Sequence, residues 1–249
     1  MAVRRDGILV TNTHVVEGAR QIAVTLSDGG RRRAALLGAD PATDIAVLDV
    51  EGDHPDVLEW GDSSRVRVGE YVLAIGNPFQ LAQTVTLGII SATGRSNIGI
   101  VDYEDFIQTD AAINPGNSGG ALVDVRGRLI GIKTAIYSET GGYQGIGFAV
   151  PSNLARRVVE QILQHGRVVR AWVGISRIGS LDEPGAANLG MTEPRGAVVW
   201  ELLRGSPADR AGRSRGTWSR PWTGVRSGTP PLCAGSSRRR RWGRGSAWI

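Results

Sequence analysis

The sequence predicts a large all-β domain followed by a smaller domain, and three observations support this fold class. Glycine accounts for 35 of the 249 residues and aromatic residues for only 6%, a composition that suits short strands joined by many turns. Apolar residues fall into short runs bounded by turn-forming residues. No long helical pattern occurs before residue 151, so the length allows one large β domain plus a smaller one.

Each short apolar run is expected to form a strand. Strands are expected at residues 8–10, 22–26, 31–37, 45–50, 72–75, 84–90, 106–109, 122–123 and 129–132, and residues 31–37 are expected to pair back as a hairpin. Residues 45–50 are almost continuously apolar, which is typical of a buried strand. A helical turn is expected at 15–18 and a surface loop at 92–103. One helix is predicted over 153–164, with Ser152 as its N-cap and Gly166 beyond its C-terminus.

The net charge of +5 depends on the last part of the chain. Residues 213–249 contain nine arginines and no Asp, Glu or Lys, so the first 212 residues alone carry a charge of −4. Such a tail can bind nucleic acid. The chain has no run of 18 apolar residues that would predict a membrane segment. Neither a metal cluster nor a phosphate loop is apparent, so no cofactor and no metal are expected.

A glycine-rich turn over residues 114–120, with the sequence NPGNSGG, is the most informative stretch. It can expose the hydroxyl of Ser118 and direct the N–H groups of Gly116 and Ser118 at one point, as an oxyanion hole requires. Taken alone, the stretch is typical of an ordinary turn. Upstream lie His14 in TNTHVV and Asp44 in TDIAVL, and the order His, Asp, Ser is one in which catalytic triads occur.

The three residues are candidates for nucleophilic catalysis. A serine needs a base within hydrogen-bond reach, and His14 is the candidate base. Asp44 would hold the imidazole tautomer and stabilise the imidazolium. The structural alternatives are a capping or core histidine at His14, and a strand-edge charge or an Asx turn at Asp44.

Longer strings surround these residues: DGILVTNTHVVEGA, TDIAVL, VGEYVLAIGNPF, FIQTDAAINPGNSGGALVD and GIGFAVPSN. With them, residues 6–174 resemble the protease domain of the HtrA/Deg family of serine endopeptidases. The resemblance implies a chymotrypsin-like double β-barrel over residues 1–168, with residues 72–75 and 84–90 in the crossing between the barrels. It implies a partial PDZ domain over residues 169–212. It also implies hydrolysis of misfolded or unfolded proteins through an acyl-enzyme, as part of protein quality control.

The resemblance also assigns binding residues. The oxyanion hole is expected at Gly116, Asn117 and Ser118, and the substrate pocket at Ile113, Thr134, Ala135, Ile136 and Gly147. No acidic residue lies in these pocket segments, so a small or medium aliphatic residue is expected before the cleaved bond. Trp172, Val173, Gly174 and Ile175 resemble the loop with which PDZ domains bind a peptide carboxylate. Mobile loops are expected at 92–103, 111–115 and 137–144, and Lys133 replaces the family's more usual Asn.

The family pattern is incomplete at both ends of this chain. Strands that normally precede Asp6 are absent, so the first barrel is expected to lack its N-terminal strands. The PDZ pattern stops at Gly212, and a reading frame shifted by two bases with GC-rich codons would restore it. Residues 213–249 are therefore expected to be a frameshifted, disordered tail.

Three hypotheses follow for function. The first is a serine endopeptidase that acts on polypeptides, with a possible homotrimer and a bacterial periplasmic, cell-envelope or secreted location as in the family. The second is a catalytically impaired relic or a chaperone-like binder of unfolded chains. The third is nucleic-acid binding through the tail, and no nucleic-acid partner is expected under the first two.

Overall fold

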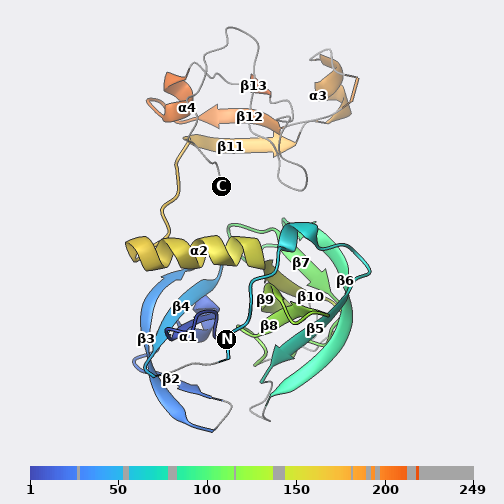
Figure 1. Ribbon diagram of the computed structural model, residues 1–249. Helices are drawn as coiled ribbons and strands as arrows, with labels where there is room; N and C mark the ends of the chain where they lie inside the picture. Colours follow the sequence, from blue (N-terminus) through green and yellow to red (C-terminus); the bar gives the residue numbers. More distant parts are fainter. Residues whose placement is uncertain are drawn as a thin grey trace. The chain divides into compact units, whose positions relative to one another are not determined.

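The structure is a computed structural model, which describes residues 1–26, 29–52, 56–77, 83–114, 116–136, 144–180, 182–188, 192–193, 197–211 and 217–218. It comprises two compact units, Met1–Val169 and Arg170–Ile249 (Figure 1). Among the described residues, none of the helices is long and apolar enough to cross a membrane.

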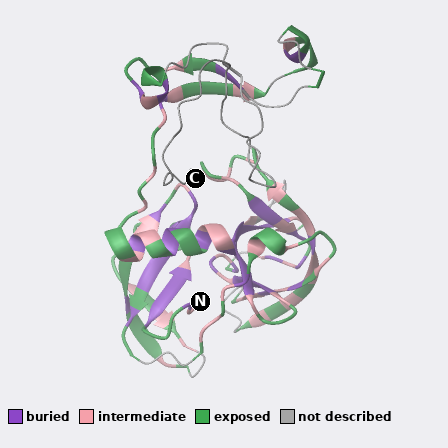
Figure 2. Ribbon diagram, turned by 45° about the horizontal axis from the view of Figure 1, so that its top comes forward, coloured by how far each residue is buried: buried purple, intermediate pink, exposed green. Residues whose placement is uncertain are grey.

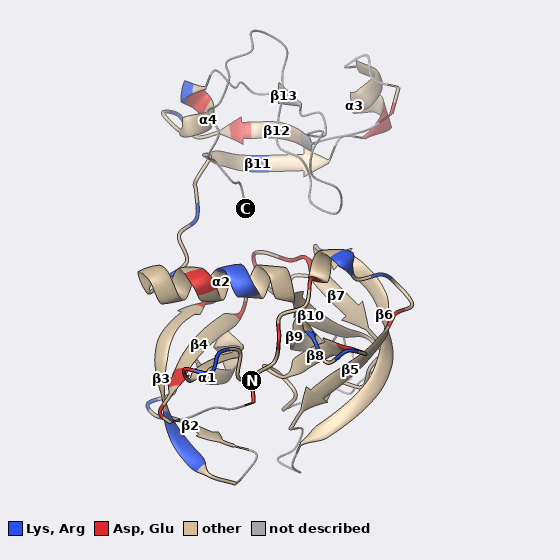
Figure 3. Cartoon of the chain, in the orientation of Figure 1, with Lys and Arg blue, Asp and Glu red and all other residues tan. Residues whose placement is uncertain are grey.

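The first unit begins with a four-stranded antiparallel sheet. Its strands are β1 (Ile8–Thr11), β2 (Ile22–Thr25), β3 (Arg31–Asp40) and β4 (Ile45–Val50), in the order β1-β4-β3-β2. The short helix α1 (Thr13–Val16) follows β1 directly. A run of basic residues, Arg31 to Arg33, lies at the start of β3 (Figure 3). This sheet is an open half-barrel, and its four strands coincide with four of the predicted runs.

The second sheet closes into a six-stranded antiparallel barrel. Its strands are β5 (Tyr71–Gly76), β6 (Thr84–Arg95), β7 (Phe106–Thr109), β8 (Ala121–Asp124), β9 (Leu129–Ile136) and β10 (Gly147–Pro151), in the order β10-β7-β6-β5-β8-β9. A single 3-10 turn, η1 (Ser63–Arg65), precedes it. The placement of residues 72–75 and 84–90 in a crossing between barrels is wrong, because all of β5 pairs with the first half of β6, Thr84 to Ile89, inside this barrel. The loop expected at 92–103 is also shorter, since β6 continues to Arg95.

Helix α2 (Ser152–His165) joins the two sheets into one core. Its buried residues include Val158 and Ile162, which share a cluster with Val10 of β1 and Phe106 of β7. Figure 2 shows the buried residues gathered in the strands, whereas much of the outer face of α2 is exposed. The half-barrel that carries His14 and the closed barrel that carries Ser118 are therefore fixed relative to each other by one apolar core.

The ends of α2 partly match the prediction. Gly166 adopts the left-handed conformation (φ 72°) that ends many helices, and its N–H donates to the Ile162 carbonyl. The N-cap is Pro151 and not Ser152. The Ser152 hydroxyl instead donates to the Gly61 carbonyl at 2.8 Å, which ties the start of the helix to the segment before the barrel.

The second unit is smaller. It contains β11 (Ile175–Ser180), α3 (Glu183–Asn188), β12 (Ala197–Leu202), α4 (Pro207–Arg210) and β13 (Thr217–Trp218), with the sheet order β11-β12-β13. Within the predicted tail at 213–249, the structure describes only Thr217 and Trp218, which pair with β12. The rest of the tail, and with it the frameshift hypothesis, lies outside the described residues.

Candidate active site

The turn that carries Asp44 is bonded to the turn that carries His14. The Asp44 carbonyl accepts hydrogen bonds from the Asn12 side-chain amide at 2.9 Å and from the Thr13 N–H at 3.2 Å. The Thr13 hydroxyl donates to the Ile45 carbonyl at 3.0 Å. Asp44 itself adopts a left-handed conformation (φ 58°), which is uncommon for a residue with a Cβ and is associated with functional sites. The pairing of β1 with β4 thus brings together two residues that are 30 positions apart.

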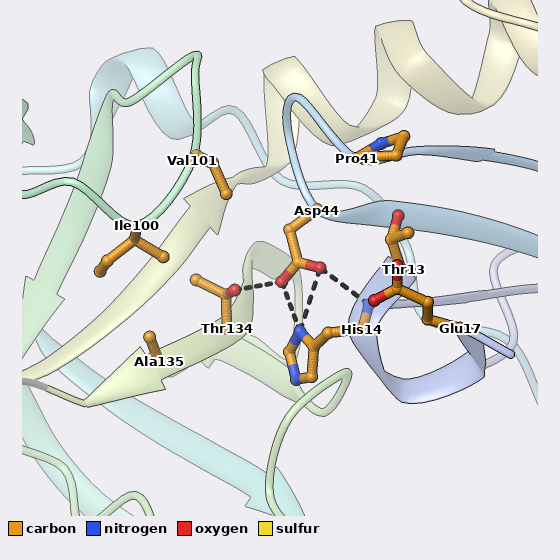
Figure 4. Close-up of a pocket in the computed structure, with 9 residues that line it drawn as sticks. All are labelled: Thr13, His14, Glu17, Pro41, Asp44, Ile100, Val101, Thr134 and Ala135. Atoms are coloured by element: carbon orange, nitrogen blue, oxygen red, sulfur yellow. Dashed lines mark hydrogen bonds and ion pairs between the residues drawn. The ribbon is translucent and has the colours of Figure 1, made fainter.

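His14 and Asp44 make direct contact. The Asp44 carboxylate lies 2.8 Å (Oδ2) and 3.0 Å (Oδ1) from His14 Nδ1, and Oδ1 also accepts the His14 backbone N–H at 3.1 Å. The Thr134 hydroxyl donates to Oδ2, so Asp44 lies between the imidazole and Thr134 (Figure 4). Asp44 is buried, and these donors satisfy its charge. A carboxylate on Nδ1 holds the proton there, which leaves Nε2 free to accept a proton.

The loop that carries Ser118 is bonded to β9 and packed against β1. The Gly119 N–H donates to the Lys133 carbonyl at 2.9 Å, and the Lys133 N–H donates to the Gly120 carbonyl at 3.0 Å. Gly119 has φ 75°, and a Cβ there would lie 2.2 Å from the Thr11 hydroxyl. Only glycine fits this close approach between the serine loop and the strand that leads to His14.

Two N–H groups of this loop are candidates for an oxyanion hole. Among the described residues, the N–H groups of Gly116 and Ser118 have no recorded acceptor. Asn117 was expected beside them, but its N–H donates to the Asn114 carbonyl at 3.0 Å, so it is not available as a donor. The backbone N–H groups of Gly116 and Ser118 therefore remain the candidate donors of an oxyanion hole.

Thr134 connects the serine with the His14–Asp44 pair. Its carbonyl accepts the Ser118 hydroxyl at 3.3 Å, while its own hydroxyl donates to Asp44. Among the described residues, Ser118 and His14 form no hydrogen bond. The Ser118 hydroxyl donates to the Thr134 carbonyl and not to the imidazole of His14. Catalytic hydrogen bonds are often long or misaligned in unliganded structures and tighten only with substrate.

The comparisons with known proteins agree with this geometry. Residues 1–132 match the trypsin-like peptidase domain family. A solved structure titled "HtrA-type protease AlgW with tripeptide" is 51% identical, with a TM-score of 0.82, and the match covers 88% of this chain and 72% of that one. This chain belongs to the HtrA-type trypsin-like serine proteases. A serine endoprotease structure from Yersinia pestis is 40% identical, with a TM-score of 0.66, over 87% of this chain and 69% of that one.

Curated HtrA-type relatives are longer than this chain. A protein of Chlamydia trachomatis named "Probable periplasmic serine endoprotease DegP-like" is 49% identical over 210 residues, which is 84% of this chain and 42% of the relative. A protein of the same name from Hahella chejuensis is 46% identical over 214 residues, which is 86% of this chain and 45% of that relative. The chain therefore spans less than half the length of these two relatives.

A pocket lies beside the histidine in this HtrA-type domain. It is lined by Thr13, His14, Glu17, Pro41, Asp44, Ile100, Val101, Thr134 and Ala135 (Figure 4). Two predicted pocket residues, Thr134 and Ala135, line it. Ile113 and Gly147 do not, but they pack together, since a Cβ on Gly147 would lie 2.5 Å from Ile113 Cδ1. Ile136 pairs with Gly147 in the barrel, and its side chain lies outside the description.

Glu104, which sequence reasoning missed, organises the apolar wall of this pocket. Its carboxylate accepts the N–H groups of Ile98 and Ile100 at 2.6 Å and of Val101 at 3.4 Å. Burial raises the pKa of Glu104, but hydrogen bonds from the backbone outweigh this effect and hold the pKa below its usual value. A lone glutamate after a glycine-rich loop gives no sequence signal for this role. Of the other loops expected to be mobile, residues 115 and 137–143 lie outside the described residues.

The loop expected to bind a carboxylate lies in the second unit. The Val173 carbonyl accepts the Ala208 N–H at 3.0 Å and the Gly174 carbonyl accepts the Leu203 N–H at 2.8 Å. Within the described part of the chain, the N–H groups of Val173 and Gly174 have no recorded acceptor. Trp172 is exposed, and Ile175 begins β11. No group of three His, Cys, Asp or Glu residues that could hold a metal occurs among the residues described.

Proposed function

We propose that this chain is a serine endopeptidase in which Ser118 is the nucleophile, His14 the general base and Asp44 the residue that orients His14. The contact of Asp44 with His14 Nδ1 at 2.8 Å is the observation that carries the proposal. It fixes the ring so that only Nε2 can take the serine proton. The N–H groups of Gly116 and Ser118 support it, because they can stabilise the oxyanion.

The proposed reaction proceeds in two halves. Ser118 Oγ leaves the Thr134 carbonyl, gives its proton to His14 Nε2 and attacks the peptide carbonyl carbon, whose oxygen takes up the negative charge. The C–N bond then breaks, and the proton on Nε2 passes to the leaving amine, which leaves an acyl-Ser118 ester. Water gives a proton to Nε2 and attacks the ester. The proton then returns to Ser118 Oγ as the acid is released.

The proposed substrates are unfolded polypeptides with a small or medium aliphatic residue before the cleaved bond. The apolar residues Ile113, Ala135 and Ile136 support this choice, since the predicted pocket segments contain no acidic residue that could pair with a basic side chain. Two related structures carry a bound tripeptide or decapeptide by their titles. A homotrimer, a periplasmic or envelope location, a role in protein quality control and PDZ-type carboxylate binding by residues 172–175 belong to the same proposal.

A second function, binding of unfolded chains without hydrolysis, is favoured by one observation. The Ser118 hydroxyl donates to Thr134 at 3.3 Å and not to His14. If this arrangement persists with substrate, the cleft retains its walls but lacks an activated nucleophile.

Cleavage of a reduced, unfolded protein separates the two functions. We expect fragments that end in Val, Ala or Leu, and none from Ser118→Ala. The matched control Ser64→Ala, a change at an exposed serine, should cleave like the wild type. Equal binding of the unfolded protein without fragments would support the second function. Cleavage only after Arg or Lys would contradict the proposed specificity.

A further inference from the structure

Lys133 is the only lysine of the chain, and it is completely buried in β9. Among the described residues, its Nζ has no hydrogen-bond partner. Burying a charged or polar group without a partner is costly, and the reaction proposed above does not use this amine. A buried, unpartnered amine next to a catalytic loop therefore requires a physical explanation.

A neighbouring polar group, the side chain of Asn117, is also unpartnered among the described residues. Asn117 is buried, and its Oδ1 has no hydrogen-bond partner within the described part of the chain. Lys133 Nζ lies 2.8 Å and Asn117 Oδ1 lies 2.3 Å from the point that a Cβ on Gly76 would occupy. Because Gly76 has no side chain, nothing from that residue separates the donor from the acceptor.

The backbone of Lys133 already holds the serine loop. Its N–H and carbonyl bond to Gly120 and Gly119, the two residues after Ser118. Asn117 directly precedes Ser118, so the plane of the Asn117–Ser118 peptide sets the direction of the Ser118 N–H. A bond from Nζ to the Asn117 side chain would secure the loop on the other side of the serine as well.

We propose that Lys133 is a positioning residue, whose amine donates to Asn117 Oδ1 and holds the Ser118 N–H in the direction that an oxyanion requires. The inference rests on the proposed peptidase function. The contact closes when the flexible side chain of Lys133 rotates its amine toward Asn117 Oδ1. A protonated amine makes the stronger, charge-assisted bond, so oxyanion stabilisation depends on the charge of Lys133.

Among the described residues, no acidic side chain pairs with the amine of Lys133. Thr134, the next residue, forms a β-bulge against β10, and its hydroxyl donates to Asp44, which is paired with His14. The serine loop and β10 contain no charged residue. Tyr71 and Asp124 lie at the far ends of β5 and β8, and Asp124 is paired with Arg128. Burial alone lowers the pKa of Lys133 from 10.5 to about 8.

The first test is the pH dependence of peptide hydrolysis. For the wild type we expect kcat to fall as the pH rises through about 8, because the amine loses its proton and the Asn117 bond weakens. Lys133→Met should lower kcat at pH 7 by about tenfold or more and should abolish this alkaline decline. Arg126→Met removes an exposed cation from the turn before β9 and should leave both unchanged. A decline that persists in Lys133→Met would overturn the inference.

The second test measures the amine without catalysis. Isotope-labelled lysine gives a single side-chain NMR signal, since Lys133 is the only lysine. Asn117→Asp places a carboxylate beside the amine and should raise the pKa of Lys133 by about one unit or more. The alkaline decline of kcat should move with it. If Asn117→Asp leaves the pKa of Lys133 unchanged, the inference is contradicted. If the wild type hydrolyses no peptide, the proposed function is contradicted instead.

Discussion

Replacing Lys133 by Met is expected to make the protein more stable and less active. The folded protein holds the pKa of Lys133 near 8, whereas the unfolded chain returns it to 10.5. Each pKa unit corresponds to about 1.4 kcal/mol, so at pH 7 the buried ammonium destabilises the fold by on the order of 3 kcal/mol. Methionine fills a similar space without a charge, but Asn117 Oδ1 then stays unpaired at a cost of about 1 kcal/mol. The expected net gain is about 2 kcal/mol.

The sign of the pH dependence is the stronger part of this prediction. Below pH 8 both states of the wild type carry the proton, and the full cost is present. Between 8 and 10.5 the unfolded chain binds more protons than the folded one, so wild-type stability rises with pH relative to the variant. The advantage of Lys133→Met should therefore shrink as the pH approaches 10.5.

Urea unfolding at pH 7, 8, 9 and 10, followed by tryptophan fluorescence, measures this difference. The matched variant Arg126→Met controls for the loss of a cation at the surface. A Lys133→Met protein that is less stable than the wild type at pH 7 would refute the reasoning. A stability advantage of Lys133→Met that stays constant or grows as the pH rises would also refute the reasoning.

Three further outcomes follow from the structure. Asp44→Asn keeps the shape of the site but favours the wrong imidazole tautomer, so kcat for peptide hydrolysis should fall by about 10⁴. Glu104→Gln weakens three hydrogen bonds to the pocket wall and should raise KM for extended peptides by about threefold to tenfold. The pKa of Glu104 lies below its usual 4.5, so the carboxylate of the wild type should keep these bonds at pH 4.5 and above. In the wild type, KM should therefore rise only when the pH falls below 4.5. Ile162→Ala leaves a cavity between α2 and both sheets and should cost about 2–5 kcal/mol in urea unfolding.

Most strands could be predicted because their apolar residues are locally patterned. Residues 45–50 formed the buried strand β4 that their continuous apolar run indicated. The assignment of 72–75 and 84–90 to a crossing was wrong because strand partners are chosen by long-range pairing, which a local pattern does not contain. The continuation of β6 to Arg95 was missed because its pairing with β7 overrides the turn preference of Gly94.

The site shows a similar division. His14 and Asp44 carried a motif, and the structure places them in contact. The contacts of Thr134 with both Ser118 and Asp44 were not predicted, because they depend on how β9 lies between the half-barrel and the serine loop. Lys133 stood out only as a departure from the usual Asn. Its burial beside Asn117 is a property of the closed barrel and has no counterpart in the sequence.

The central claim is that Ser118 is a nucleophile activated by His14. A fluorophosphonate forms a stable adduct only with an activated serine, and peptide mapping by mass spectrometry locates the adduct. We predict one adduct, on Ser118, that is absent from Ser118→Ala and strongly reduced in His14→Ala. An intact protein without an adduct, or an adduct that remains on another serine in Ser118→Ala, would contradict the claim.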